Sequence, residues 1–127
     1  MTKSQDKAIV LLGHGSKKED ANNILKDLAK MLEKESEHLI YSSFLQFTSP
    51  TLEDTIEEIS KTEVNSITVV PVFLFPGIHL TKDIPKKVDE LKEKYPSTSF
   101  QIADPIGADK RLIPILKERA ENPENQM

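Results

Sequence analysis

The sequence contains no cysteine and no tryptophan among its 127 residues, and it has only four glycines and two tyrosines. The absence of cysteine excludes disulfide bonds, thiolate metal ligands and a cysteine nucleophile, so any bound metal must have imidazole or oxygen ligands. The first apolar run, residues 8–12, is far shorter than the roughly 20 residues that a membrane-spanning helix needs. Residues 1–6 are polar, unlike the start of a secretory signal peptide. We therefore expect a cytoplasmic protein without a membrane anchor.

The balance of charge is acidic, with 17 lysines and arginines against 21 aspartates and glutamates and a formal net charge of −4. Such a chain offers no basic surface of the kind that binds nucleic acid. Its length suffices for one hydrophobic core but not for a separate substrate domain. We therefore expect a single domain over residues 1–127, with frayed tails at 1–6 and 122–127.

Four short apolar segments predict buried β-strands, and each is followed by the apolar spacing of an amphipathic helix. The strands are expected at residues 8–12, 38–47, 67–75 and 99–103, and the helices near residues 18–35, after 50, from 81 or 83 to 94, and from 112. Strands that alternate with helices are typical of a parallel α/β sheet covered by helices on both faces. Right-handed crossovers favour the flavodoxin-like strand order 2-1-3-4 in so short a chain.

Candidate capping residues predict where three of these helices begin. The candidates are Ser16 with Glu19 completing a capping box, Ser49 ahead of Pro50, and Thr81 or Asp83 with Pro85 in the first turn.

Two of the three histidines follow predicted strands. His14 stands between Gly13 and Gly15 after the first strand, and His79 comes shortly after the third. In the order 2-1-3-4 these strands are neighbours, about 4.8 Å apart, and the topological switch point lies between their carboxyl ends. We therefore expect both imidazoles to meet at one small ligand or ion, whereas His38, at the start of the second strand, is expected to be solvated.

These residues also have ordinary structural explanations. His14 could hydrogen-bond locally in a tight turn, and His79 could be a surface histidine. Ser16 and Lys17 at a helix start could bind a carboxylate or phosphate, or could form a solvated helix end. Four phenylalanines in or near the strands are interpreted mainly as core, with apolar walls for a planar ligand as the alternative: Phe44, Phe47, Phe73 and Phe75.

Two neutral imidazoles with open coordination positions suit cobalt, nickel, iron or zinc better than magnesium or calcium. Other motifs that could explain the glycine-flanked histidine are incomplete. The segment lacks the spacing of a phosphate-binding P-loop, and no G-x-S-x-G nucleophile elbow is present. The residues themselves thus leave both interpretations open, a weak metal site built on two histidines and a purely structural role for them.

Three segments resemble the small CbiX-type chelatases of the class II chelatase superfamily, which insert a divalent metal into sirohydrochlorin. They are LLGHGSKKEDAN at residues 11–22, YSSFLQFTSPTLEDTIEE at 41–58 and ITVVPVFLFPGIHLTKDIP at 67–85, with DPIGADKRLIPIL following at 104–116. The third segment is the most specific, because it combines P-x-F-L, G-x-H and D-I-P.

The resemblance implies that His14 and His79 bind the metal and that one or both accept the protons that leave the pyrrole nitrogens. Cobalt, iron or nickel would be a substrate, in cobalamin, siroheme or related tetrapyrrole biosynthesis, and no organic cofactor is implied. The resemblance also implies a homodimer that holds the tetrapyrrole in the cleft between two copies.

Four further residues are candidates for contact with the macrocycle: Ser16, Lys17, Gln46 and Lys82. The family commonly has glutamate at the position of Gln46, and an amide can neither accept a proton at neutral pH nor carry charge. A non-catalytic metal or tetrapyrrole carrier with the same fold is therefore the alternative to an enzyme. A flavodoxin-like structural module, in which neither histidine binds a ligand, is a third hypothesis.

Overall fold

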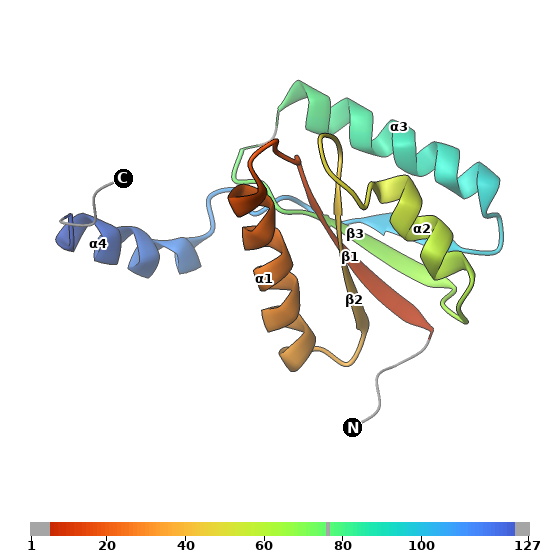
Figure 1. The fold of residues 1–127 in the computed structure, drawn as a ribbon, viewed down its shortest axis with the longest axis horizontal. Helices are drawn as coiled ribbons and strands as arrows, with labels where there is room; N and C mark the ends of the chain where they lie inside the picture. The colour runs from red at the N-terminus through yellow and green to blue at the C-terminus, as the bar shows by residue number, and fades with distance from the viewer. Residues whose placement is uncertain (1–5, 76, 124–127) are drawn as a thin grey trace.

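A four-stranded parallel sheet forms the centre of the molecule (Figure 1). The structure is a computed structural model that describes residues 6–75 and 77–123, with residues 78–81 described by their backbone alone. The strands are β1 (Lys7–Gly13), β2 (Leu39–Phe44), β3 (Ser66–Pro71) and β4 (Ser99–Ile102). They lie side by side in the order β2-β1-β3-β4, as the sequence predicts.

Helices cover both faces of this sheet, which confirms the predicted α/β architecture. They are α1 (Glu19–Glu35), α2 (Leu52–Ser60), α3 (Ile78–Lys94), a 3-10 helix, η1 (Lys110–Leu112), and α4 (Ile113–Glu121). Figure 1 shows α1 on one side of the sheet, α2 and α3 on the other, and α4 extending away from the sheet. No helix among the described residues is long and apolar enough to cross a membrane.

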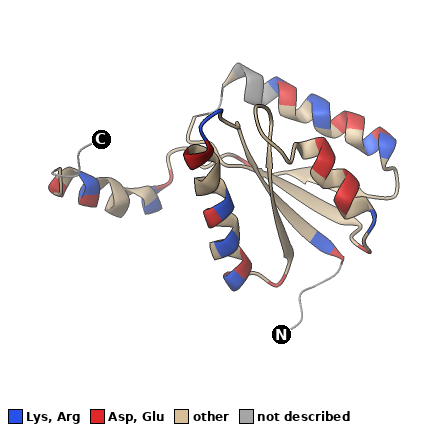
Figure 2. Ribbon diagram, in the orientation of Figure 1, with Lys and Arg blue, Asp and Glu red and all other residues tan. Residues whose placement is uncertain are grey.

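Successive side chains of each strand point to opposite faces of the sheet and produce two apolar layers. In β1, Val10 and Leu12 pack with α2 and α3 in the larger core, while Leu11 packs with Leu25 of α1 in the smaller one. A central strand buried on both faces has apolar residues at consecutive positions, which explains the continuous run at the start of the chain. Charged side chains lie mainly on the helices (Figure 2).

The start of α2 differs from the prediction. Its N-cap is Thr51, whose hydroxyl accepts a hydrogen bond from the Asp54 amide, while the Asp54 carboxylate accepts one from the Thr51 amide, each at 3.1 Å. Ser49 is therefore not the cap. The carbonyl of Pro50 accepts a hydrogen bond from the Phe44 amide at 2.9 Å, so Pro50 belongs to the extended connection beside β2.

The predicted capping box at the start of α1 is also wrong. The N-cap is Lys18, and its side chain makes no capping hydrogen bond. The Ser16 hydroxyl instead accepts a hydrogen bond from the Lys18 amide at 3.0 Å, and the Glu19 carboxylate pairs with Lys26 at 3.1 Å. Both side chains of the expected box therefore have other partners.

The third helix begins earlier than predicted, at Ile78 directly after Gly77, so neither Thr81 nor Asp83 is its cap. Pro85 consequently lies inside α3 rather than in its first turn. Proline cannot donate the helical backbone hydrogen bond, but burial of the side chains of Ile84 and Val88 against the core offsets that loss. The last helix begins next to Leu112, in agreement with the prediction.

A buried pair of hydroxyls joins β2 to α2. Ser43 donates a hydrogen bond to Thr55 at 2.5 Å, and both residues are buried. We expect Ser43→Ala to lower the free energy of unfolding by about 1–3 kcal/mol, because it leaves the Thr55 hydroxyl without its partner. The double variant Ser43→Ala/Thr55→Val should lose less than the sum of the two single variants in urea denaturation. Strictly additive losses would contradict this coupling.

Candidate functional site

His14 lies at the carboxyl end of β1, where two glycines allow a close approach of backbone segments. Gly15 has a φ of +90°, and a Cβ at this position would lie 1.8 Å from the carbonyl oxygen of Gln46. The Gln46 amide in turn donates a hydrogen bond to the carbonyl of His14 at 3.1 Å. The loop that carries His14 thus runs directly beside the segment that carries Gln46, as the order of β1 and β2 predicts.

The imidazole of His14 is exposed at this edge and rests against a buried ring. It meets the ring of Phe73 edge-on, with 4.5 Å between the ring centroids and 80° between the planes. Phe73 follows β3 and belongs to the larger core. Phe73 therefore sets the orientation of a side chain that otherwise faces solvent.

Asn22 fixes the same loop from the other side. Its Oδ1 accepts a hydrogen bond from the Ser16 amide at 2.9 Å, and its Nδ2 donates one to the Ser16 carbonyl at 2.8 Å. Asn22 is 98% buried, as only 2% of its surface is exposed. Because Asn22 pairs both polar groups of one backbone unit, it acts as a clamp on the turn after His14.

We expect Asn22→Ala to lower the free energy of unfolding by about 1–3 kcal/mol, because two backbone groups lose a buried partner. The metal insertion that the resemblance implies should slow more than this loss of stability explains, since the turn after His14 loses its clamp. Urea denaturation measures the loss of stability, and rates measured well below the melting temperature measure the loss of activity. Asn23→Ala, on the exposed side of α1, is the control for both. A variant with unchanged stability and rate would contradict the role of Asn22.

Gln46 and His14 line a cavity of about 220 Å³ together with Leu45 of the same loop and with Asp83 and Lys87 of α3. Lys87 is held there by an ion pair with Glu53 of α2 at 2.9 Å. The cavity therefore brings an imidazole, an amide, a carboxylate and an ammonium group together at the carboxyl edge of the sheet.

His79 lies in the first turn of α3, four residues before Asp83. Its backbone thus comes shortly after the carboxyl end of β3, the strand next to β1. The side chain of His79 lies outside the described part of the structure, so its meeting with His14 stays a prediction. Among the described residues, which exclude this imidazole, no group of three His, Asp or Glu side chains could hold a metal ion.

The other predicted contact residues have different surroundings. The Lys17 ammonium lies 5.3 Å from the centroid of the Phe47 ring, directly beyond Gln46 in the chain. Ser16 is partly buried by its bonds to Asn22, and Lys82 is exposed on α3. The structure thus brings Ser16, Lys17 and Gln46 to the His14 edge, and Lys82 lies on the helix that lines the cavity.

The four phenylalanines divide into two pairs. Phe44 and Phe73 are buried, as the interpretation of these residues as core requires. Phe47 and Phe75 are exposed, with 59% and 81% of their surface accessible. The alternative interpretation, apolar walls for a planar ligand, therefore applies to this exposed pair only.

His38 lies at the opposite edge of the sheet from His14. It is half-buried, and its Nδ1 is buried without a hydrogen-bond partner among the described residues. The expectation of a solvated side chain is therefore wrong for this ring nitrogen, although the residue as a whole is partly exposed.

Comparison with known protein families shows where this chain belongs. The family model described as CbiX matches residues 8–122. The chain belongs to the CbiX family. A relative of this CbiX chain, the sirohydrochlorin cobaltochelatase of Sulfurisphaera tokodaii, is 34% identical over 113 residues, which cover 89% of this chain and 90% of that protein.

Two solved structures show how this CbiX chain relates to proteins of similar and of greater length. A CbiX protein from Marinobacter aquaeolei VT8, described as a putative cobalamin biosynthesis protein, matches with a TM-score of 0.80 and 28% identity, over 94% of this chain and 99% of that one. The sirohydrochlorin chelatase SirB from Bacillus subtilis in complex with cobalt matches with a TM-score of 0.86 and 27% identity, over 92% of this chain but only 50% of that one. This CbiX chain thus matches half of the SirB chain.

Two residues that hold the site were not predicted as part of it. Asn22 could have been found, because it stands with Leu25, Ala29 and Leu32 on the buried stripe of α1, where a polar residue needs a partner. Phe73 was considered only as one of four phenylalanines that form the core or a wall for a planar ligand, and its spacing gave no sign of a contact with His14.

Proposed function

We propose that this CbiX-family protein is a sirohydrochlorin chelatase, an enzyme that inserts a divalent metal into sirohydrochlorin. The observation that carries the proposal is the exposed imidazole of His14, held at the carboxyl edge of the sheet by Phe73 and by the clamped turn after it. Relatives from several organisms are named sirohydrochlorin cobaltochelatases or ferrochelatases. Cobalt is the first candidate for the metal, and iron and nickel also suit imidazole ligands.

In the proposed reaction, His14 and His79 hold the metal ion as a substrate next to the macrocycle. Insertion forms metal–nitrogen bonds and releases two protons from the pyrrole nitrogens, and neutral imidazole is a suitable acceptor for them near neutral pH. Holding the metal over the ring replaces a slow encounter of two solvated partners. No organic cofactor takes part in this scheme.

The macrocycle would lie against the exposed rings of Phe47 and Phe75, which offer flat apolar surface. Ser16, Lys17 and Lys82 would bind its peripheral carboxylates, with Lys17 already placed over Phe47. Gln46 would line the metal path, because it shares the cavity with His14.

We further propose that the enzyme works as a homodimer in the cytoplasm, with the tetrapyrrole in the cleft between two copies. The match to half of the SirB chain supports two copies, since a pair supplies the same number of such units.

Turnover distinguishes this enzyme from a carrier that only binds metal or macrocycle. We expect the absorbance spectrum of sirohydrochlorin, mixed with cobalt, iron or nickel and a small amount of protein, to change faster than without protein. The amount of metallated product should exceed several molecules per protein chain. A change that stops at one product per chain would establish the carrier instead.

Gln46→Glu is expected to raise the insertion rate by about 10-fold or more, because a carboxylate can attract the metal and accept a proton where the amide cannot. The same assay measures this effect, with Gln101→Glu on the exposed side of β4 as the matched control. An unchanged rate in Gln46→Glu would exclude Gln46 from the path of the metal.

A further inference from the structure

The cavity between His14 and α3 contains a carboxylate that the sequence indicated only as a possible helix cap. This carboxylate belongs to Asp83, which is exposed on α3 and lines the cavity of about 220 Å³ with His14 and Gln46. Among the described residues that line this cavity, Asp83 alone carries a negative charge. A metal ion that reaches His14 through the cavity therefore passes this carboxylate.

The positive charge in the same cavity is offset by a neighbouring helix. Lys87 lies one helical turn beyond Asp83, and its ammonium alone would oppose the entry of a cation. That ammonium is paired with the carboxylate of Glu53 of α2 at 2.9 Å. Two carboxylates and one ammonium together leave one net negative charge at this place, so the cavity favours a cation.

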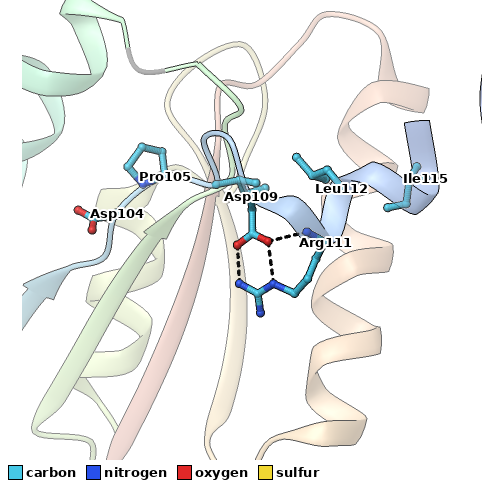
Figure 3. Close-up of a pocket in the computed structure, with 7 residues that line it drawn as sticks. Asp104, Pro105, Asp109, Arg111, Leu112 and Ile115 are labelled. Atoms are coloured by element: carbon cyan, nitrogen blue, oxygen red, sulfur yellow. Dashed lines mark hydrogen bonds and ion pairs between the residues drawn. The ribbon is translucent and has the colours of Figure 1, made fainter. Parts of the chain in front are cut away.

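A second cavity with aspartates lies beyond β4 and is arranged differently (Figure 3). Its volume is about 390 Å³, and Asp104, Asp109 and Arg111 are among its lining residues. Asp109 accepts hydrogen bonds from the backbone amide of Arg111 at 2.9 Å and from its Nε at 2.8 Å, and it also pairs with Nη2 of the same guanidinium. Asp109 is thus bound by a cation of its own chain, and His14 is not among the described residues that line this second cavity.

We propose that Asp83 binds the incoming metal ion, and that its carboxylate attracts the divalent ion into the cavity and contacts it before the ion reaches His14. A charged group in a cleft raises the local concentration of ions of opposite charge, and the neutral amide of Gln46 cannot do so. Asp83 stands four residues after His79, so the two positions share one face of α3. The inference rests on the proposed chelatase and specifies how its metal substrate enters the site.

Asp83→Asn tests this role, because it removes the charge and keeps the size of the side chain. We expect cobalt binding to the full chain to weaken at least about fivefold in calorimetry, and KM for cobalt in the insertion assay to rise at least about fivefold. KM for sirohydrochlorin should stay within about twofold, since the carboxylate acts on the metal and not on the macrocycle. Asp89→Asn, at an exposed position of α3 that is not among those lining the cavity, is the matched control and should change neither constant.

Two further variants separate the charge of Asp83 from a structural role. Gln46→Glu, added to Asp83→Asn, places a carboxylate in the same cavity from a different segment and should restore cobalt affinity to within about twofold of the unchanged protein. Glu53→Gln leaves Asp83 in place but removes the charge that offsets Lys87, so it should also weaken cobalt binding. This variant keeps the test available if urea denaturation shows that Asp83→Asn does not fold.

Unchanged cobalt affinity and an unchanged KM for cobalt in Asp83→Asn would overturn the inference. An equal rise of KM for cobalt and for sirohydrochlorin, or no recovery of affinity on adding Gln46→Glu, would overturn it as well. Cobalt binding is measured without the macrocycle, and insertion by the unchanged protein is measured in parallel. Failure of the chelatase assignment, seen as no insertion by the unchanged protein, is therefore distinct from failure of the role of Asp83, seen in calorimetry.

Discussion

His14→Ala is expected to lower kcat/KM for metal insertion by at least about 100-fold, the usual range for loss of a group that transfers protons in the transition state. The same change removes one proposed ligand of the metal. Stability should change little, because the imidazole is exposed and its described ring contact is a single T-shaped one with Phe73. His79→Ala is expected to cause a loss of similar size.

The third histidine provides the matched control for this experiment. His38 lies at the opposite edge of the sheet, and its buried Nδ1 has no partner within the described residues. We therefore expect His38→Ala to retain both activity and stability. Equal activity of His14→Ala and His38→Ala in the sirohydrochlorin assay would contradict the role of His14.

Gly15→Ala is expected to have the largest effect on stability. A side chain at a φ of +90° costs about 1–2 kcal/mol, and the new Cβ would lie 1.8 Å from the backbone oxygen of Gln46. Backbone cannot move aside as a side chain can, so the hydrogen bond from the Gln46 amide to His14 must break as well. We expect a total loss of about 2–4 kcal/mol in the free energy of unfolding, together with a loss of metal insertion.

Gly77→Ala is the control for Gly15→Ala. A Cβ at Gly77 would meet nothing within 4 Å, and its φ of −111° suits any residue. We expect a loss below about 1 kcal/mol, the usual cost of alanine at a helix N-cap. Urea denaturation of both variants measures the difference. Similar losses at the two glycines would show that the contact with Gln46 does not cause the loss of stability in Gly15→Ala.

The sheet was predictable because its signals are local and strong. Strand β1 is apolar at consecutive positions, and the alternation of strands and helices leaves few topologies. Helix starts were less predictable. Ser49 has the right chemistry for a cap, but the carbonyl of the next residue, Pro50, accepts a hydrogen bond from the Phe44 amide of β2. Only the folded chain shows that contact.

The site and the last helix illustrate the same limit. The position of His14 at the end of β1 follows from the sequence, but the contacts of its loop with Gln46 and its ring with Phe73 depend on the packing of three separate segments. The apolar residues of α4 correctly predict a helix, but the structure leaves all of its residues exposed. Their spacing in the sequence gave no sign of this exposure.

Isothermal titration calorimetry of the purified protein with cobalt tests the central claim that His14 and His79 hold one metal ion together. The account predicts one cobalt per chain in the unchanged protein and at least tenfold weaker binding, about 1.4 kcal/mol, in either alanine variant. The double variant should lose less affinity than the sum of the two single losses, because either single variant already breaks the shared site. Unchanged affinity in both single variants, or two separate ions lost one at a time, would contradict a shared site.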